Sequence, residues 1–370
     1  MPKYLLSGTN VHGRSVTELV TARSADEAMR RYQARGYADV VLHSDEVHGH
    51  LFDPSAMEHL TPRDYLTLGR VSRPHYLWLL VLRMYRQQWG LMFLLAAWVI
   101  GRRALDAPWT LLDYLPLAFL LLPAVIVLAG EVVSPSRKFE RAMSFAAWAR
   151  WAEMRAALPA VRGMVPDAQF AFYEARALAG LGKLVEALEV VRPYADDPNT
   201  PAWLYWGQLA DVFVGAKLPD RAIECLEKAV EHAPDNATTL IDLAMGLLRY
   251  RRDTARARPL LERAHNHAVS DLLAPFLTLA DGVLALEERR PEEARRLLET
   301  SLAGAERYRH TTALMGAAID RIHVYLCLAC AATGDPAAAE RHFRRAEPRL
   351  RAFAADDLVE RCQAALGERA

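Results

Sequence analysis

The chain has 370 residues, which is enough for two or three domains of ordinary size. Lysine and arginine together number 45, as do aspartate and glutamate, so the formal net charge is zero. No overall field therefore favours nucleic acid or an acidic substrate, and we expect no nucleic-acid partner. The hydrophobic fraction of 52% is slightly above the soluble average, and one region carries the excess.

Residues 1–51 predict a small α+β module. The helix Ala25–Arg35 is expected after Ser24, a suitable N-cap with Glu27 as its capping-box partner. Gly36 then lies where a glycine commonly ends a helix. Three segments are predicted as short strands: Tyr4–Ser7, Val16–Ala22 and Asp39–His43.

This β-β-α-β order resembles the small N-terminal modules of type II secretion and type IV pilus assembly proteins. Those modules carry a strand, a glycine turn and a second strand, followed by the pattern A-x-S-x-x-E-A at the start of a helix. The matching residues are Ala22, Ser24, Glu27, Ala28 and Gly36. The resemblance covers the N-terminal module alone and implies an assembly role at a membrane.

Residues 52–86 are predicted to be a linker with short helices. Thr61-Pro62 is expected to open one helix, and Arg73-Pro74 to break it. Before them, the stretch 43–59 is rich in groups that can bind a metal: His43, Asp45, Glu46, His48 and His50. Their spacing matches no defined site, and a solvated linker is the alternative interpretation.

Residues 87–133 are predicted to be a transmembrane helical hairpin. Two uncharged blocks, Trp89–Gly101 and Tyr114–Gly130, become long enough for a bilayer of about 30 Å once their flanks are included. A buried hairpin in a soluble core is the alternative, but so apolar a run is hard to bury in a repeat solenoid, which requires amphipathic helices. The residues expected to anchor the hairpin are Trp89, Trp98, Trp109, Tyr114 and Leu121.

The cations around the hairpin predict its orientation. The loop between the two blocks holds only Arg102 and Arg103. The flanks hold more cations: Arg70, Arg73, Arg83 and Arg86 before the hairpin, and Arg137, Lys138, Arg141 and Arg150 after it. By the positive-inside rule, both termini and the C-terminal helices are expected in the cytoplasm, with the hairpin in the inner (plasma) membrane.

Residues 134–370 are predicted to be an α-solenoid. One stretch carries the small and large apolar residues of two helices joined by a tight turn: Trp206, Leu209, Ala210, Phe213, Ala222, Leu226, Ala229 and Pro234. This spacing resembles a tetratricopeptide repeat (TPR). A single helix pair of this kind cannot bury its apolar stripe, so the resemblance implies a stack of such pairs.

Other units follow the same pattern less closely before and after that stretch. Their expected packing residues are Ala175, Leu178, Ala187, Ala244, Ala257, Ala294, Ala339 and Phe343. The unit with Ala244 carries one extra residue in its turn, and Thr278 and Asp281 in the next unit stand where larger apolar residues are usual. Asp357–Leu366 is expected to be a capping helix.

The sequence shows no catalytic constellation. It holds no Gly-rich phosphate loop, no H-E-x-x-H and no G-x-S-x-G. Cys327 and Cys330 form a C-x-x-C, which is either a redox pair, half of a zinc site, or two small residues on a buried helix face. Because no second motif completes a site, we expect neither an enzyme nor a cofactor.

The sequence therefore predicts a mainly α protein that combines a TPR-like α-solenoid, a transmembrane hairpin and a small N-terminal α+β module. The expected function is a membrane-anchored scaffold or adaptor of a bacterial inner membrane, which binds proteins through the solenoid groove. One rival is a structural subunit of a membrane-embedded secretion or pilus-type assembly, alone as a homo-oligomer or within a complex. The other is a metal-dependent enzyme that uses the His-rich linker.

Overall fold

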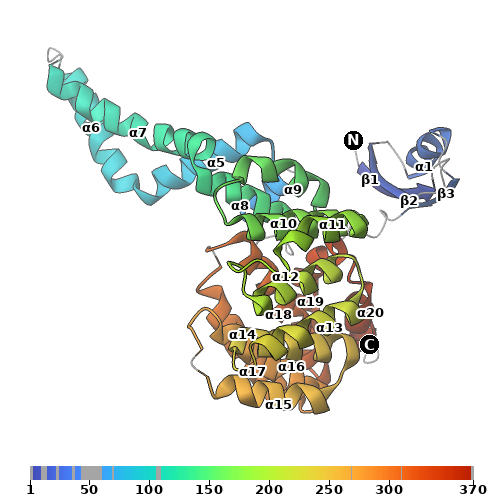
Figure 1. The fold of residues 1–370 in the computed structure, drawn as a ribbon. Coiled ribbons are helices and arrows are strands. Elements are labelled where there is room, and N and C mark those ends of the chain that lie inside the picture. Colours follow the sequence, from blue (N-terminus) through green and yellow to red (C-terminus); the bar gives the residue numbers. More distant parts are fainter. Residues whose placement is uncertain are drawn as a thin grey trace. The chain divides into compact units, whose positions relative to one another are not determined.

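The computed structural model shows a mainly helical chain (Figure 1). The described residues are 3–9, 15–21, 25–35, 38–42, 61–68, 71–105, 110–267, 269–309 and 311–367. Contacts divide the chain into two compact units, one of Met1–His59 with Asp320–Ala370 and one of Leu60–Ile319. Several features discussed above lie outside the described residues: Ala22, Ser24, Gly36, the His-rich stretch 43–59, Arg70 and Trp109.

The N-terminal residues form a three-stranded antiparallel sheet with one helix. The strands β1 (Lys3–Thr9), β2 (Ser15–Thr21) and β3 (Ala38–Leu42) pair in the order β2-β1-β3. Helix α1 (Ala25–Ala34) packs against all three strands. Its Tyr32 is fully buried, so this aromatic ring anchors the helix to its surroundings.

Two helices occupy the segment that the sequence assigns to a linker. Helix α4 (Pro62–Thr67) begins with a capping box between Thr61 and Asp64. Helix α5 (Arg73–Gln87) has 15 residues and begins at Ser72, whose hydroxyl accepts a hydrogen bond from the backbone of His75. Pro74 lies in the first turn of α5, where its missing N–H is not needed, so this proline begins a helix.

Helices α6 (Trp89–Ala104) and α7 (Leu111–Val133) pack side by side, and α5 also packs against α7 (Figure 1). Two helices of the described chain are long and apolar enough to cross a membrane, in α7 at Tyr114–Glu131 and in α18 at Ala313–Ala332. Only 12% of the first window is buried, whereas 67% of the second is. Mostly buried helices of this kind are typical of protein cores, so α7 is the stronger candidate. Helix α6 has 16 residues, fewer than the about 20 that a helix needs to cross a bilayer.

Helices α8 to α17 follow one another as antiparallel pairs (Figure 1). Their bounds are α8 Pro135–Ala146, α9 Trp151–Ala157, α10 Asp167–Gly180, α11 Leu184–Val191, α12 Ala202–Gly215, α13 Pro219–His232, α14 Ala237–Gly246, α15 Thr254–His265, α16 Ala274–Glu287 and α17 Pro291–Glu306. Short 3₁₀ turns follow α9 at Leu158–Val161 and α11 at Arg192–Tyr194. The first helix of one pair also packs on the first helix of the next, as α10 does on α12 and α12 on α14.

A left-handed residue recurs at the same place in the turns of five consecutive helix pairs, from α10–α11 to α18–α19. Gly182, Lys217, Arg252, Arg289 and Gly334 have φ values of 75°, 61°, 53°, 60° and 81°. Each lies five residues before a buried alanine of the second helix: Ala187, Ala222, Ala257, Ala294 and Ala339. The next N–H closes a Schellman-type bond to the first helix, for example from Leu218 to the Phe213 carbonyl at 2.9 Å. Four of these five turns thus share one geometry.

The pair of α14 and α15 departs from this geometry by one residue. Helix α14 ends in a π-helical turn at Leu247–Arg251, and the closing bond runs from the Asp253 N–H to the Leu247 carbonyl at 3.3 Å. That bond spans one residue more than its counterparts do. The π turn therefore absorbs the extra residue that the sequence shows in this unit.

The unit of Met1–His59 and Asp320–Ala370 also contains the part of α18 from Asp320 onward, α19 (Pro336–Ala352) and α20 (Asp356–Gly367). The guanidinium of Arg349 donates a hydrogen bond of 2.5 Å to Asp320, and both side chains are buried. Helix α20 packs on α19. It covers the residues at which the sequence predicts a capping helix.

Candidate functional site

Apolar side chains cover the outside of α6 and α7. On α6, Trp89 is 72% exposed, and Trp98 is exposed as well. On α7, Tyr114 and Leu121 are both more than half exposed. Their exposed apolar neighbours are Leu91, Phe93, Leu94, Ile100, Leu115, Phe119, Leu122, Val125, Ile126 and Leu128. So many large apolar side chains on two adjacent helices mark a surface that contacts lipid or protein.

Helix α5 runs antiparallel to α7, and two tyrosines fix its position. The hydroxyl of Tyr85 donates a hydrogen bond to the carbonyl of Leu120, near the middle of α7. The hydroxyl of Tyr76 lies 3.4 Å from Oε1 of Glu131, near the end of α7. Both donors use the polar tip of an otherwise apolar ring, so α5 adds to the exposed apolar surface without leaving these hydroxyls unpaired.

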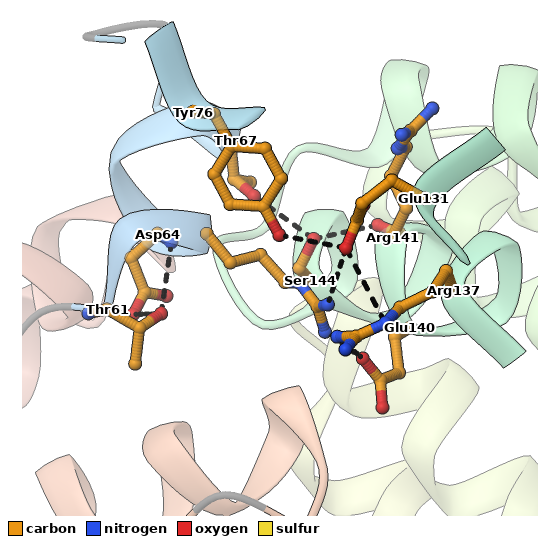
Figure 2. A network of polar contacts seen from close by, with 10 residues as sticks. Thr61, Asp64, Thr67, Tyr76, Glu131, Arg137, Glu140, Arg141 and Ser144 are labelled. Atoms are coloured by element: carbon orange, nitrogen blue, oxygen red, sulfur yellow. Dashed lines mark hydrogen bonds and ion pairs between the residues drawn. The ribbon is translucent and has the colours of Figure 1, made fainter. Parts of the chain in front are cut away.

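A polar cluster around the buried Glu131 connects the base of α7 to α4, α5 and α8, and Figure 2 shows it. We call Arg63, Tyr76, Glu131, Arg137 and Glu140 the polar joint. Glu131 is only 7% exposed, and its carboxylate lies 3.5 Å from Nε of Arg137 and 4.0 Å from Nη2 of Arg63. Arg63 and Arg137 both also pair with Glu140. Two arginines thus neutralise two glutamates where α7 meets α8.

Further hydrogen bonds attach α4 to α8 beside the polar joint. The Thr67 hydroxyl lies 3.0 Å from the Ser144 hydroxyl, which itself donates to the Arg141 carbonyl at 2.8 Å (Figure 2). The indole N–H of Trp148 donates to Asp64 at 2.8 Å. These bonds hold the base of the apolar helices on the first helix pair.

The electrostatics of the polar joint act on Arg63 and Tyr76. Burial alone lowers the pKa of Arg63, but the hydrogen bond to Glu140 and the neighbouring negative charge raise that pKa above its usual value. Burial raises the pKa of Tyr76, with Arg63 opposing and Glu131 adding to the effect. Arg63 therefore stays charged, and Tyr76 stays a neutral hydroxyl that donates to Glu131.

The residues that the sequence assigns to repeat packing are almost all buried. Buried members are Ala175, Leu178, Ala187, Leu209, Ala210, Phe213, Ala222, Leu226, Ala229, Ala244, Ala257, Ala294, Ala339 and Phe343. Trp206 is half-buried, with the Lys228 ammonium 4.2 Å from its ring centroid, and Pro234 is exposed. Gly282 occupies the position of Ala210 in its pair, where an added Cβ would lie 2.8 Å from Leu298. Small residues at this position let the two helices cross closely.

The C-x-x-C motif belongs to this packing pattern. Cys327 and Cys330 are fully buried free thiols. Cys327 and Cys330 lie seven and four residues before the left-handed Gly334. Ala210 and Phe213 lie seven and four residues before the left-handed Lys217, so the cysteines occupy the same two positions in their own helix pair. Within the described ranges, no group of three or more His, Cys, Asp or Glu side chains could hold a metal. The structure therefore places these thiols in the core of a helix pair.

Comparison with known proteins adds no family to this picture. No protein-family model matches the chain, and no curated protein matches it in sequence. Function has to be argued from the apolar helices, the polar joint and the helix pairs.

Proposed function

We propose that this protein is a membrane-anchored scaffold of TPR type. The bilayer holds α6 and α7, and the helix pairs bind partner proteins. One observation carries the proposal: α7 is long enough to span a bilayer, yet only 12% of its apolar window is buried. An apolar surface of this extent is unfavourable in water and favourable in lipid.

The helix pairs supply the binding part of the proposal. Their turns repeat one geometry, and their buried alanines recur at one position, as expected for a repeat array. Such arrays present extended surfaces to partners, and we propose that a helix or peptide of a partner protein binds the groove formed by the first helices. On this surface, Arg176 of α10 and Asp211 of α12 form a pair at 3.6 Å.

The proposal includes an orientation. Cations flank the apolar helices on the side of the helix pairs, where Arg137 and Lys138 are exposed. We therefore place both termini and the helix pairs in the cytoplasm of a bacterium, with the apolar helices in its inner membrane. The N-terminal resemblance to secretion and pilus modules supports the same setting.

Fractionation of cells tests the membrane part. We expect the native chain to pellet with membranes after a carbonate wash. Leu121→Arg with Val125→Arg places two charges on the exposed face of α7 and should move the protein to the aqueous fraction. Val185→Arg is the control, because Val185 is also apolar and exposed but lies on α11. A native chain in the aqueous fraction contradicts the proposal.

Affinity purification tests the scaffold part. The full chain, extracted in mild detergent, should retain partner proteins in fixed stoichiometry. Charge reversal at Asp211 should weaken their retention, whereas reversal at Glu224, exposed on the second helix of the same pair, should not. Equal retention by both variants contradicts binding through the first helices.

A second candidate is a structural subunit of a membrane-embedded assembly. The observation that favours it is α5, a third helix alongside α7 whose outer face is also exposed. In that case the apolar helices contact other membrane helices as well as lipid.

A further inference from the structure

Two arginines of α5 lie level with the middle of the apolar window of α7. The window runs over Tyr114–Glu131, so its middle falls at Leu122 and Pro123. Because Tyr85 contacts Leu120 and Tyr76 contacts Glu131, the helices are antiparallel, with residues 76–85 of α5 alongside residues 120–131 of α7. At about 1.5 Å of rise per residue, Arg83 and Arg86 both lie within about 6 Å of that level.

These arginines point outward from the protein. Both are exposed, on the face of α5 that also carries the exposed Trp78 and Leu82. Among the described residues, neither arginine has an ion pair or hydrogen bond to a side chain of its own chain. Arg83 and Arg86 therefore place two positive charges on an apolar face with no counter-charge from the described residues.

We propose that Arg83 and Arg86 dock a membrane-spanning helix of another protein that carries Asp or Glu near its middle. This rests on the proposed membrane insertion of α7. Ionisable side chains within the membrane face protein or a water-filled cavity and pair with one another. The face of Trp78, Leu82 and Arg86 supplies both halves of such a contact: an apolar ridge and a positive charge.

The bilayer geometry argues against lipid phosphate as the counter-charge. The middle of a hydrocarbon core of about 30 Å lies about 15 Å from either headgroup layer. An arginine near a helix end can extend its head to the interface, but an arginine at this level is too far away.

A second copy of the chain does not supply the counter-charge either. A two-fold axis along the membrane normal places each residue at the same depth as its copy. The acids of the predicted hairpin are Asp106 and Asp113, which lie between its two uncharged blocks, and Glu131, which follows the second block, so none lies in the middle of a block. Such a dimer brings arginine against arginine at the middle level.

Site-specific photo-crosslinking in intact membranes tests the proposal. A photoreactive side chain at Leu82 should give a discrete adduct whose crosslinked peptide is an apolar helix containing Asp or Glu. The same probe at Leu94, exposed on α6, should give lipid adducts. Arg83→Leu with Arg86→Leu should reduce the adduct at Leu82 by about tenfold or more, because the buried acid of the partner loses its counter-charge.

Control variants separate the causes of a lost adduct. Arg83→Lys with Arg86→Lys keeps both charges and should keep the adduct, and Arg73→Leu at the start of α5 should leave it unchanged. Lipid adducts alone at Leu82, an adduct to a second copy, a partner peptide without an acid, or an adduct indifferent to the double leucine variant each overturns the proposal. The same membranes are washed with carbonate, so a chain found in the aqueous fraction identifies failure of the membrane anchor itself.

Discussion

Lys217 is held in the left-handed region, with φ at 61°, and lies five residues before Ala222, which is buried against the facing helix. A side chain in this region costs about 1 kcal/mol relative to glycine. Gly182 and Gly334 fill the same turn position without that cost.

Lys217→Gly should therefore stabilise the protein. We expect the free energy of unfolding to rise by about 0.5–1 kcal/mol, measured by urea denaturation in mild detergent. Gly182→Ala should lower it by a similar amount. A gain from both substitutions, or from neither, contradicts a shared turn geometry.

Two alanines on α19 form a matched pair for testing close helix packing. Ala339 is fully buried at the repeated alanine position, and Ala337 is exposed two residues before it. Ala339→Leu overpacks the helix crossing and should cost about 1–3 kcal/mol. Ala337→Leu should change the free energy of unfolding by less than about 0.5 kcal/mol. If the two substitutions destabilise the protein equally in thermal and urea unfolding, the helices do not cross closely at Ala339.

Glu131→Gln should disrupt the polar joint. The substitution removes a buried carboxylate that faces both Arg63 and Arg137, and leaves their charges less compensated. We expect a loss of about 2–4 kcal/mol in unfolding free energy. The control is Glu153→Gln, whose more exposed pair with Arg150 should contribute about 0.5 kcal/mol. If the Glu131 variant is as stable as the Glu153 variant, the polar joint does not stabilise the fold as proposed.

Asp281 should give stability a pH dependence. Burial raises the pKa of Asp281, while His265, 2.9 Å away, lowers it less. The folded state therefore binds the proton of the Asp281 carboxyl more tightly than the unfolded state does. Protonation of Asp281 stabilises the folded protein at pH values below the unfolded pKa, and this stabilisation is lost as pH rises through the folded pKa. Asp281→Asn should raise the urea midpoint at pH 7, with a smaller gain at pH 4. A gain that grows toward pH 4 contradicts this sign.

Cys225 should be chemically inert in the folded protein. Burial raises the pKa of the Cys225 thiol to about 11. At pH 8 only about one molecule in a thousand then carries the reactive thiolate. Pulsed alkylation with mass spectrometry should show slow labelling of the native chain and rapid labelling in denaturant. Rapid labelling of Cys225 in the native chain contradicts its burial.

The mainly helical fold could be predicted from the sequence because the apolar positions repeat at helical spacing. The extra residue in the turn of the unit with Ala244 was visible in the sequence, but its absorption by a π turn was not. Asp281 stands out in the sequence as a polar residue at an apolar position. Its partner His265 lies on the preceding helix, and that contact becomes visible only when the pairs stack.

The membrane part was less accessible to sequence reasoning. The proline at residue 74 predicts the end of a helix, whereas the structure begins the 15-residue α5 there. Of the two predicted spanning blocks, only the one in α7 has the length and composition of a membrane helix. Helix α18, which the sequence assigns to the solenoid, also has them, whereas α6 does not. The polar joint could not be predicted, because Arg63 lies far from Glu131 and Glu140 in the sequence.

The π turn of α14 has a consequence for how this array can evolve. An additional residue within an α-helix rotates everything after it by about 100°, which would turn the apolar face of α15 away from its neighbours. Here the surplus residue is confined to the wide turn, and Ala257 keeps its place five residues after Arg252. Single-residue insertions at this type of corner can therefore accumulate without changing the phase of the helices that follow.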